Sequence, residues 1–522
     1  MDNFQKTIPV VMNTVQWLQN LAPATTLNLV SDSRKVQVGD VFFAYPVGNA
    51  DGRNYIQQAI AQGACAVVYE ELNFTWDAKW NLPHFAVANL LWQSGFIASS
   101  YLNQPDATLF TVAVTGTNGK TSCTQWLARA MSLLGTPTCV VGTLGVGLVK
   151  NGRAGEFDVT GFTTPDAIQL QQKIATQRDL GAAAIAIEAS SIGLEQGRMN
   201  GMHVDVAVLT NFTRDHLDFH GDMASYEAAK TKLFEWSNLT AAVLNFDDAA
   251  GLRLLQLCKT RGTQVLGYTV ESTVDAAIDF GEQVSVLRAS NLRNYHGGTS
   301  FHLDSPFGSG VIKTQMIGRF NVSNVLAVLA TLFAKGIAWR DAVHAIEQLT
   351  SVAGRMEQLS APGRVLVIID YAHTPDALEK TLLNLKEVAQ QRQGKLWCVF
   401  GCGGDRDPGK RPEMGKIAEL ADEIIATSDN PRNEEPEHIL SQIAAGFTAN
   451  RTPVPMMEPD RAKAILYAIK HADKNDVVLL AGKGHEAYQE IKGKKLPFSD
   501  IDHAHIALAD LATKFVNKGG AV

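Results

Sequence analysis

A glycine-rich turn between an apolar run and a helical pattern is the feature that most constrains the fold of this chain. The apolar residues 110–114 lead into the sequence TGTNGKTS, and a helical pattern covers 123–134. Gly116 and Gly119 allow backbone amides to turn inward on an anion, the following helix presents its positive end, and Lys120 adds a charge. The order strand, loop, helix therefore predicts a loop that holds phosphate groups.

The spacing within this loop differs from that of the common ATPases and GTPases. Their pattern GxxxxGK[ST] needs a glycine where this chain has Val114. Thr121, directly after the lysine, is placed to ligate magnesium. The alternative interpretation is an ordinary strand-to-helix turn, and the combination of strand, glycines, lysine and helix argues against it.

The alternation of strand-like runs and helical patterns extends over the whole chain. Its 522 residues exceed what one hydrophobic core usually holds, and we expect three domains, at 1–107, 108–352 and 353–522. The alternation predicts α/β domains with largely parallel sheets, in which ligands bind at the carboxyl ends of strands. The first domain is expected to hold a strand, a helix and a strand at 40–44, 55–63 and 64–69, and the last one strands at 365–369, 396–400, 423–427 and 477–480.

Composition excludes several classes of protein. The chain has 46 Lys and Arg against 53 Asp and Glu, and its net charge of −7 offers no basic surface for nucleic acid. Its longest apolar runs fall well short of the roughly 20 residues that a membrane helix needs. The first residues do not form a secretory signal, so we expect a cytoplasmic protein. The six cysteines show no CxxC spacing, and we expect them to be reduced and mostly buried.

The loop TGTNGKTS resembles the phosphate loop of the Mur ligase family, ATP-dependent enzymes that form amide bonds and include the folylpolyglutamate synthetases. The likeness extends over nearly the whole chain and is greatest to the diaminopimelate-adding ligases of the family. It implies a UDP-substrate-binding domain at 1–107, a central P-loop ATPase domain with a parallel sheet at 108–352, and a Rossmann-like amino-acid-binding domain at 353–522. The implied cofactors are ATP and Mg²⁺. The implied substrates are UDP-N-acetylmuramoyl-L-alanyl-D-glutamate and meso-2,6-diaminopimelate, used by a monomer in peptidoglycan precursor synthesis.

Titratable residues follow two expected strands of the central domain. Glu188 ends an apolar run, a placement that suits a magnesium ligand beside the phosphate loop. The loop NFTRDHLDFHG at 211–221 follows another such run. Any one of its side chains could be a solvated loop residue or a cap, but a place beside the phosphate loop favours a functional role. The resemblance assigns a second magnesium to His216.

Two lysines, Lys230 and Lys232, lie on a segment that is helical by pattern, and the pattern alone predicts that both are exposed. The resemblance selects Lys230, which carbon dioxide N-carbamylates in the family, so that an ammonium becomes an anion near the second magnesium. The implied metal ligands are Thr121, Glu188, His216 and carbamylated Lys230, and the implied catalytic residues are Lys120, Glu188, His216 and Lys230.

Residues outside the phosphate loop are also implied in ATP binding. Asn324, Arg355 and Asp370 align with family positions around the nucleotide. From the residues alone, Asn324 and Arg355 are explained equally well as polar side chains of a helix and a linker, whereas Asp370 ends an expected strand. The implied ATP-binding residues are Gly116, Thr117, Asn118, Gly119, Lys120, Thr121, Ser122, Asn324, Arg355 and Asp370.

Short Ser, Asp and Gly segments resemble those that hold the UDP-linked substrate, although such segments are also common turns. Arg198 is available for a carboxylate or a phosphate. Phe162 stands where related ligases often carry Asn. The implied UDP-substrate-binding residues are Ser31, Ser33, Gly48, Asn49, Ala50, Thr163, Thr164, Ser190, Gln196 and Arg198.

Three strand-end loops of the last domain supply two arginines, an amide and a carboxylate, which together suit a zwitterion with an extra carboxylate. Arg432 lies in the motif DNPR, and it would attract that carboxylate and repel the side-chain ammonium of lysine. The alternative for DNPR is an Asn-Pro turn with a surface arginine. The implied diaminopimelate-binding residues are Arg406, Asp429, Asn430, Pro431, Arg432, Gly482 and Glu486.

The resemblance implies that ATP phosphorylates the γ-carboxylate of the D-glutamate residue and that the amine of diaminopimelate attacks the acyl phosphate. Either His216 or a substrate oxygen could deprotonate that amine. The nearest alternative is the lysine-adding ligase of the same family. A folylpolyglutamate synthetase would lack the UDP segments and DNPR, and a non-catalytic ATP-binding protein would leave Glu188, His216 and Lys230 without a role.

Overall fold

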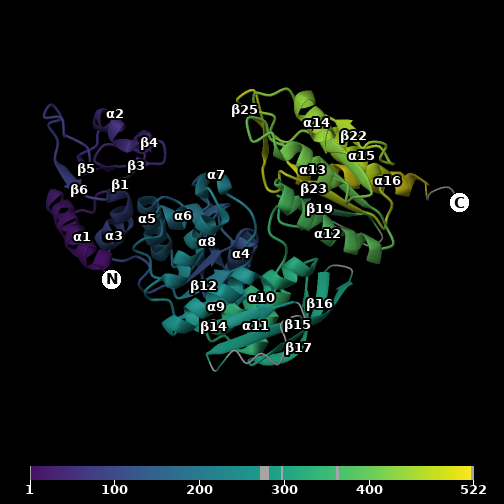
Figure 1. Cartoon of the computed structure of the whole chain (residues 1–522), viewed down its shortest axis with the longest axis horizontal. Helices are drawn as coiled ribbons and strands as arrows, with labels where there is room; N and C mark the ends of the chain where they lie inside the picture. The colour runs from purple at the N-terminus through teal and green to yellow at the C-terminus, as the bar shows by residue number, and fades with distance from the viewer. Residues whose placement is uncertain (1, 271–280, 282, 296–297, 360–363, 519–522) are drawn as a thin grey trace. The chain divides into compact units, whose positions relative to one another are not determined.

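The computed structural model describes residues 2–270, 281, 283–295, 298–359 and 364–518 (Figure 1). It is an α/β structure that forms two compact units. One unit takes residues up to 288 together with 304–309 and 324–346, and the other takes 289–303, 310–323 and the chain from 347 onward. The expected domain boundaries at 107 and 352 stay predictions. The second lies close to residue 347, from which the chain belongs to the second unit.

The N-terminal part contains a small parallel sheet with the order β1-β2-β5-β6. The expected strand, helix and strand are confirmed as β2, α2 and β5, and Val41 of β2 pairs with Ala66 of β5. Its elements are α1 (Asp2–Leu21), β1 (Leu29–Val30), η1 (Ser33–Lys35), β2 (Val41–Ala44), β3 (Pro46–Val47), β4 (Ala50–Asp51), η2 (Gly52–Tyr55), α2 (Ile56–Ala61), β5 (Ala66–Glu70), β6 (His84–Val87) and α3 (Leu90–Tyr101).

The central sheet has eleven strands in the order β10-β9-β8-β11-β7-β12-β13-β14-β15-β16-β17. The run from β8 to β15 is parallel, and its inner strands are continuous apolar runs because helices cover both faces. These strands are β7 (Phe110–Thr115), β8 (Thr138–Gly142), β9 (Gly145–Lys150), β10 (Arg153–Ala154), β11 (Ala184–Glu188), β12 (Val206–Leu209), β13 (Ala241–Asn245), β14 (Gln264–Thr269), β15 (Val284–Tyr295), β16 (Gly298–Ser305) and β17 (Gly308–Thr314).

Short polar side chains begin several of the central helices. Asp166, Ser190, Asp222 and Asp248 each accept a hydrogen bond from a backbone amide in the first turn of the helix that follows. The helices are α4 (Lys120–Leu133), α5 (Ala167–Asp179), α6 (Ser191–Glu195), α7 (Leu217–His220), α8 (Met223–Thr231), η3 (Lys232–Glu235), α9 (Ala249–Arg261), α10 (Arg319–Ala334) and α11 (Trp339–Glu347).

The helix after the phosphate loop begins earlier than its sequence pattern predicts. The pattern covers 123–134, whereas α4 starts at Lys120. Gly119 takes the left-handed conformation, with φ 87°, and so turns the chain into the helix three residues sooner. Lys120, Thr121 and Ser122 therefore belong to the first turn, where free amides can face an anion.

The C-terminal sheet has the order β18-β19-β23-β20-β21-β22 and is parallel from β19 to β22. All four expected strands are confirmed, with bounds that differ by one residue at most. The elements are β18 (Glu357–Leu359), β19 (Leu366–Asp370), α12 (Pro375–Gln391), β20 (Leu396–Phe400), α13 (Lys410–Ala418), β21 (Glu423–Thr427), α14 (Pro436–Ala444), β22 (Met456–Glu458), α15 (Arg461–His471), β23 (Val477–Ala481), β24 (Tyr488–Ile491), β25 (Lys494–Pro497) and α16 (Asp500–Lys518).

Alternating residues of β19 show how this sheet is buried on both faces. Leu366 and Ile368 pack in one apolar cluster with residues of α12, α13 and α14. Val367 and Ile369 pack in a second cluster with α15 and α16. The period of two follows from the alternation of side chains along a strand. Two helical layers therefore hold the strands, and their carboxyl ends remain for the loops.

The expectation of mostly buried cysteines is confirmed. All six cysteines are free; five are buried and Cys65 is half-buried. Among the helices that the structure describes, none combines the length and the apolar character that a membrane span requires.

Candidate active site

The phosphate loop follows β7 and is held from behind by the segment after β12. Thr210 Oγ1 donates to the carbonyl oxygen of Asn118 over 2.6 Å, and the amide of Asn118 donates to Asn211 Oδ1 over 2.9 Å. Thr117 Oγ1 donates to the carbonyl oxygen of Thr213 over 3.0 Å. These contacts shape the loop from residues about 90 positions further along the chain, as the parallel neighbours β7 and β12 allow.

The side chains of Lys120 and Asn324 lie against the phosphate loop. Lys120 Nζ donates to the carbonyl oxygens of Gly116 and Thr117, both at 2.8 Å. A Cβ atom on Gly119 would lie 2.5 Å from Asn324 Oδ1, so the glycine is needed for this close approach. Asn324, predicted to contact the nucleotide, is therefore placed beside the phosphate loop.

Glu188 ends β11 and is almost completely buried, at 1% exposure. Its carboxylate accepts hydrogen bonds from the hydroxyl of Thr121 at 3.0 Å, the amide of Thr143 at 2.9 Å and the hydroxyl of Thr143 at 3.2 Å. The structure thus joins the two predicted magnesium ligands Thr121 and Glu188. Thr143 was missed. It follows β8, which was not predicted, and a threonine in a loop carries no sequence signal of its own.

His216 starts the short helix α7 with a left-handed backbone, φ 52°. Its ring faces the carboxylate of Asp215 at 3.5 Å and packs edge-on against Tyr226. Burial lowers the pKa of His216; Asp215 opposes this, whereas the charges of Lys120 and Lys230 lower the pKa further. The imidazole that results is a neutral donor or ligand near the side chains of Lys120 and Lys230.

Lys230 is buried, at 3% exposure, so the expectation of an exposed lysine from the helical pattern is wrong. Its Nζ donates to the carbonyl oxygen of Gly116 at 2.9 Å and lies 4.5 Å from the centre of the Tyr226 ring. Burial and then the charge of Lys120 hold the pKa of Lys230 well below its usual value. Lys232 follows the pattern better, because it is partly exposed and pairs with Glu195 at 2.7 Å.

The donor chemistry here fits magnesium with few protein ligands. Within the part of the chain that the structure describes, no three His, Cys, Asp or Glu side chains form a cluster that could hold a metal. Mg²⁺ in nucleotide sites is usually bound by one or two protein oxygens together with phosphate oxygens and water. The buried Glu188 carboxylate and the Thr121 hydroxyl, both next to the phosphate loop, supply that number.

A second group of predicted residues surrounds Arg198. Its Nη1 donates to the carbonyl oxygen of Thr164 at 2.8 Å, and its Nε and Nη2 donate to Gln196 Oε1 at 3.0 and 2.7 Å. The hydroxyl of Thr164 in turn donates to the carbonyl oxygen of Glu188 at 2.7 Å and lies 2.9 Å from that of Ser190. The structure therefore brings four predicted substrate residues together beside the predicted metal ligand.

Two contacts extend this group. Thr163 and Thr143 place their hydroxyls 3.1 Å apart. Phe162, at 55% exposure, covers the guanidinium of Arg198, which lies 4.8 Å from the ring centre. Burial lowers the pKa of Arg198. Phe162 thus adds a cation–π contact to the Arg198 group.

The predicted residues of the N-terminal part are divided. Ser31 donates to Asp166 Oδ1 at 3.0 Å, which joins it to the start of α5 near the Arg198 group. Ser33 lies in η1, with Gln58 at 3.4 Å. Gly48 and Asn49 form the exposed turn between β3 and β4, and the exposed Ala50 is the first residue of β4. Among the described residues, no hydrogen bond joins this turn to the Arg198 group.

Arg355 and Asp370 lie together in the second unit. The Asp370 carboxylate ends β19 and accepts hydrogen bonds from the amides of Met356 at 2.8 Å and Ala372 at 2.9 Å. Burial raises the pKa of Asp370, and Arg355 opposes this rise. The guanidinium of Arg355 lies 4.7 Å from the centre of the Tyr371 ring. Asn324, the third residue outside the phosphate loop that is predicted to bind ATP, belongs to the first unit.

Asn430 and Glu486, from the loops after β21 and β23, meet directly. Asn430 Nδ2 donates to Glu486 Oε2 at 2.9 Å. The fully buried Lys483 donates from Nζ to Glu486 Oε2 at 3.0 Å and to Asn430 Oδ1 at 3.2 Å. A Cβ atom on Gly482 would lie 2.5 Å from Asp429 Oδ2, so this glycine lets the two loops approach. Lys483 was missed, although it lies between the predicted residues Gly482 and Glu486.

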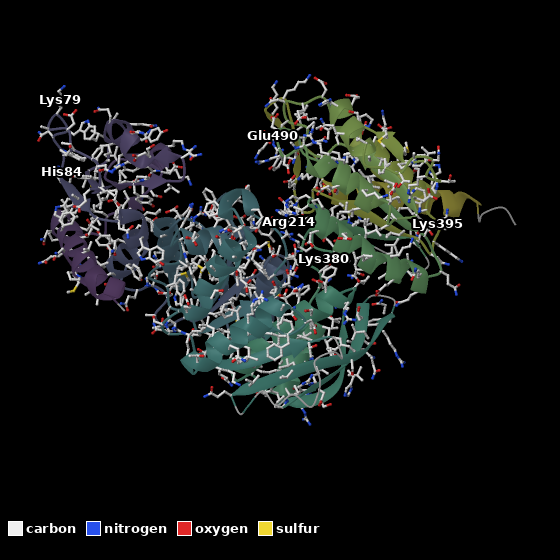
Figure 2. All side chains as sticks on the ribbon, viewed as in Figure 1. Lys79, His84, Arg214, Lys380, Lys395 and Glu490 are labelled. Atoms are coloured by element: carbon white, nitrogen blue, oxygen red, sulfur yellow. The ribbon has the colours of Figure 1, made fainter. Side chains whose placement is uncertain are left out.

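Arg432 is half-buried and is held by two acceptors. Its Nη1 donates to the carbonyl oxygen of Gly404 at 2.8 Å, and its Nε lies 3.3 Å from Glu490, which is labelled in Figure 2. The DNPR motif is therefore more than a turn with a surface arginine, and Glu490 is a partner that no sequence signal indicated. Arg406 is exposed, and Pro431 is buried against Gly404.

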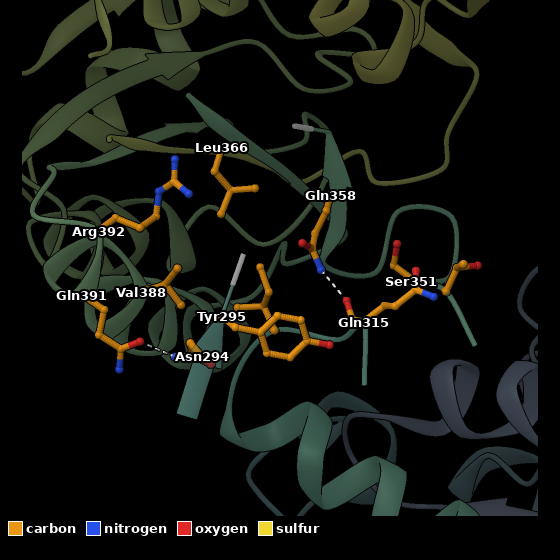
Figure 3. Close-up of a pocket in the computed structure, with 11 residues that line it drawn as sticks. Asn294, Tyr295, Gln315, Ser351, Gln358, Leu366, Val388, Gln391 and Arg392 are labelled. Atoms are coloured by element: carbon orange, nitrogen blue, oxygen red, sulfur yellow. Dashed lines mark hydrogen bonds between the residues drawn. The ribbon is translucent and has the colours of Figure 1, made fainter. Parts of the chain in front are cut away.

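A cavity of about 510 Å³ lies elsewhere in the second unit (Figure 3). Amides, hydroxyls and an arginine line most of it, and two pairs of these groups already bond each other or the backbone. None of the residues predicted for substrates, nucleotide or metal lines this cavity. Its lining is Asn294, Tyr295, Gln315, Ile317, Thr350, Ser351, Gln358, Leu366, Val388, Gln391 and Arg392.

Comparison with known proteins gives full-length matches. Three family descriptions fit the chain in order: Mur ligase family, catalytic domain, at 28–88; Mur ligase middle domain at 114–332; and Mur ligase, glutamate ligase domain, at 354–484. The UDP-N-acetylmuramoyl-L-alanyl-D-glutamate--2,6-diaminopimelate ligase of Janthinobacterium sp. (strain Marseille) is 57% identical over 505 residues, which cover 96% of this chain and 98% of that protein.

Solved structures agree with these matches. The structure of a UDP-N-acetylmuramoyl-L-alanyl-D-glutamate--2,6-diaminopimelate ligase is 34% identical, with a TM-score of 0.66, and the match covers 95% of this chain and 99% of that one. A Mur ligase from Thermotoga maritima in complex with ADP has the same fold, with a TM-score of 0.60 at 20% identity over 88% of this chain and 94% of that one.

Proposed function

Because the chain belongs to the Mur ligase family, we propose that it adds meso-2,6-diaminopimelate to the γ-carboxylate of D-glutamate in UDP-N-acetylmuramoyl-L-alanyl-D-glutamate, with ATP as energy source. The observation that carries this proposal is the 57% identity, over nearly the full length of both chains, to a ligase named for this reaction. The phosphate loop and the strand-end loops of the C-terminal sheet supply groups with the matching chemistry. The product is a peptidoglycan precursor.

Amide formation requires activation, since a carboxylate oxygen is a poor leaving group. The γ-carboxylate takes the terminal phosphoryl group of ATP and becomes an acyl phosphate, and ADP leaves. The unprotonated amine of diaminopimelate then attacks the acyl carbon, the C–O bond to phosphate breaks, and amide and phosphate remain. This chemistry needs no protein nucleophile, and the protein acts by positioning and charge.

The residues from Gly116 to Ser122 would hold the ATP phosphates. In the structure Lys120 rests on the carbonyl oxygens of Gly116 and Thr117. These neutral acceptors are weaker partners than phosphate oxygens, so the lysine can turn to the phosphates when they bind. Asn324 beside the loop, and Arg355 with Asp370, would contact the rest of the nucleotide.

Thr121 and Glu188 would hold one Mg²⁺, and His216 and a carbamylated Lys230 would hold another. Bound magnesium supplies positive charge that offsets the charge of the phosphate oxygens. Glu188 is oriented for this role by its three hydrogen-bond donors. Carbamylation of Lys230 forms a bond between its uncharged amine and carbon dioxide with loss of a proton, and its lowered pKa supplies that uncharged amine.

Amino-acid recognition is proposed for the loops after β20, β21 and β23. Arg432 and Arg406 would bind the distal carboxylate of diaminopimelate, and the remaining contacts would come from Asp429, Asn430, Pro431, Gly482 and Glu486. The half-buried position of Arg432 supports this role, because a cation there disfavours the side-chain ammonium of lysine. That repulsion separates the proposed activity from that of a lysine-adding ligase.

The UDP-linked substrate is proposed to lie along the Arg198 group, with Thr163, Thr164, Ser190 and Gln196, and along Ser31, Ser33, Gly48, Asn49 and Ala50. We assign these contacts to a domain at 1–107 and to the neighbouring part of the ATP-binding domain at 108–352, and amino-acid binding to 353–522. The link between Ser31 and Asp166 supports the shared site. Because ATP and nucleotide-linked precursors are cytoplasmic metabolites, the proposed place of action is the cytoplasm.

The test is phosphate release by the purified protein with ATP, Mg²⁺ and UDP-N-acetylmuramoyl-L-alanyl-D-glutamate, with meso-diaminopimelate or L-lysine as the amine. We expect release with diaminopimelate only. Preference for lysine would support the lysine-adding alternative and overturn the role of Arg432. Release with a folate and glutamate would support a folylpolyglutamate synthetase, and ATP binding without release would support a non-catalytic protein.

A further inference from the structure

Arg461, the first residue of α15, is a fully buried cation that no proposed substrate contact uses. Its Nε donates to Asp500 Oδ1 at 2.7 Å and its Nη2 to Asp500 Oδ2 at 2.6 Å. Both side chains are 0% exposed. Two charges taken out of water are stabilised only when they pair well and their remaining donors are bonded. The other bonds of Arg461 therefore show what the pair holds in place.

Those bonds go to two backbone carbonyls at the carboxyl edge of the sheet. Arg461 Nη2 donates to the carbonyl oxygen of Ala481 at 3.0 Å, and its Nη1 donates to that of Ser428 at 3.4 Å. Ala481 is the last residue of β23, and Ser428 directly follows β21. In the sheet these strands are separated by β20, so no strand-to-strand ladder joins them. One guanidinium spans that distance.

The residues next to these carbonyls are those proposed to bind the incoming amino acid. Asp429 and Asn430 follow Ser428, and Gly482 and Lys483 follow Ala481. The contacts of Asn430 with Glu486 and Lys483, at 2.9 and 3.2 Å, join the two loops beyond the Arg461 side chain. Such contacts require a loop spacing that is correct within a few tenths of an ångström.

We propose that Arg461, held by Asp500, is a positioning residue that sets the spacing of the Asp429–Asn430 and Gly482–Glu486 loops for the amino-acid substrate. The inference rests on the proposed function, since it assigns those loops to diaminopimelate. Arginine suits the task because its planar fork bonds Asp500 on one side and still reaches two carbonyls. A lysine has a single nitrogen and cannot bridge the same groups.

Arg392, which directly follows α12, provides a matched control at the same sheet. It also bonds backbone carbonyls, with its Nε 3.1 Å from that of Asn475 and its Nη2 3.0 Å from those of Arg364 and Lys474. These carbonyls precede β19 and β23, at the amino edge. Arg392→Lys therefore removes a similar carbonyl clamp at the edge of the sheet away from the proposed substrate loops.

The experiment compares the wild type with Arg461→Lys, Asp500→Asn and Arg392→Lys in the phosphate-release assay. We expect Arg461→Lys and Asp500→Asn to raise the KM for diaminopimelate about tenfold or more, because charged hydrogen bonds that orient the loops are lost. The KM for ATP should change by less than about twofold, and Arg392→Lys should leave both constants near the wild-type values. An unchanged KM for diaminopimelate, or an equal change in Arg392→Lys, overturns the proposal.

Amide hydrogen exchange gives a readout that does not need turnover. In folded Arg461→Lys or Asp500→Asn, amides at 428–432 and 482–486 should exchange faster than in the wild type, whereas those of β19 and β20 should not. Unchanged exchange in the two loops contradicts the positioning role. If Arg461→Lys does not fold, the KM values and the amide exchange of Asp500→Asn test the positioning role. A wild type without diaminopimelate-dependent release would instead count against the proposed function, and exchange would still decide whether Arg461 orders the loops.

Discussion

Lys120 and Lys230 donate hydrogen bonds to one carbonyl oxygen, that of Gly116, over 2.8 and 2.9 Å. Burial disfavours charge on Lys230, and the neighbouring ammonium group of Lys120 adds repulsion, so the pKa of Lys230 is low. The uncharged amine is the form that reacts with carbon dioxide. Carbamylation would then replace the repulsion between the two side chains by attraction, which gives the proposed modification a local cause.

Replacing Lys230 should therefore reduce activity, whereas replacing the nearby Lys232 should not. We expect Lys230→Ala to lower phosphate release by about 100-fold or more, the usual effect of deleting a group that offsets transition-state charge. A short carboxylic acid added to this variant should restore part of the rate by replacing the carbamate. The control is Lys232→Ala, because Lys232 is partly exposed and pairs with Glu195. Equal losses in both variants would refute a specific role for Lys230.

Glycine at position 119 should be essential for nucleotide binding. In Gly119→Ala the Cβ would lie 2.5 Å from Asn324 Oδ1, and the left-handed backbone, φ 87°, adds strain. Gly135 at the other end of α4 has a similar φ of 82° and nothing within 4 Å of a Cβ. Both substitutions should cost about 1–2 kcal/mol of stability, but only Gly119→Ala should raise the KM for ATP, by about tenfold or more. Thermal unfolding and ATP titration of both variants test this difference.

Arg432 should determine which amine is used. We expect Arg432→Ala to raise the KM for diaminopimelate by about 10–100-fold, because a half-buried charged contact is lost. The rate with lysine, which is low in the wild type, should not fall. Lys492→Ala is the control for a general change in charge, since Lys492 is exposed and pairs with Glu435 at 3.2 Å. A selectivity ratio for the two amines that stays at the wild-type value in Arg432→Ala would contradict this specificity role.

Acid should destabilise the C-terminal part of the chain through Glu434. Its carboxylate accepts from Arg411 Nη2 and Nη1 at 2.8 and 2.9 Å, and this contact lowers the pKa of Glu434 to about 2. Because the folded pKa lies below the unfolded value, the added stability is present above about pH 4.5 and is lost as the pH falls toward about 2.

Urea unfolding of wild type and Glu434→Gln at several pH values measures this contribution. We expect the wild type to be more stable by about 2 kcal/mol at pH 7, with a difference that shrinks below about pH 4.5. The neighbouring Glu435 is exposed, and Glu435→Gln should show little difference at any pH. A constant difference between wild type and Glu434→Gln across the whole range would mean that the ion pair does not cause it.

Sequence patterns predicted the four inner strands of the C-terminal sheet and the loops that carry Asp370, Asn430 and Glu486, because parallel strands are short apolar runs with ligand loops at one end. The join between Thr121 and Glu188 followed from the same rule. The burial of Lys230 did not, since it depends on packing against Gly116, 114 positions away. A helical period reports which face is polar and not what covers that face.

Buried charged residues also could not be predicted from the sequence. Lys483 and Arg461 are fully buried, yet in the sequence they are a lysine in a glycine-rich loop and an arginine at a helix start. Their partners Glu486, Asn430 and Asp500 make burial possible, and only Glu486 is close in sequence. Pairing across tens of residues is set by the sheet order, which local patterns do not contain.

That sheet order also governs when the C-terminal part can assemble during synthesis. β23 is made last of the parallel strands but lies between β19 and β20, so β19 has no parallel neighbour until residues 477–481 leave the ribosome. Until then the strands exist as two separate groups, β18-β19 and β20-β21-β22. Such late, non-local pairing is slow and leaves strand edges open to aggregation. The loops that would bind the amine are therefore completed only when nearly the whole chain has been translated.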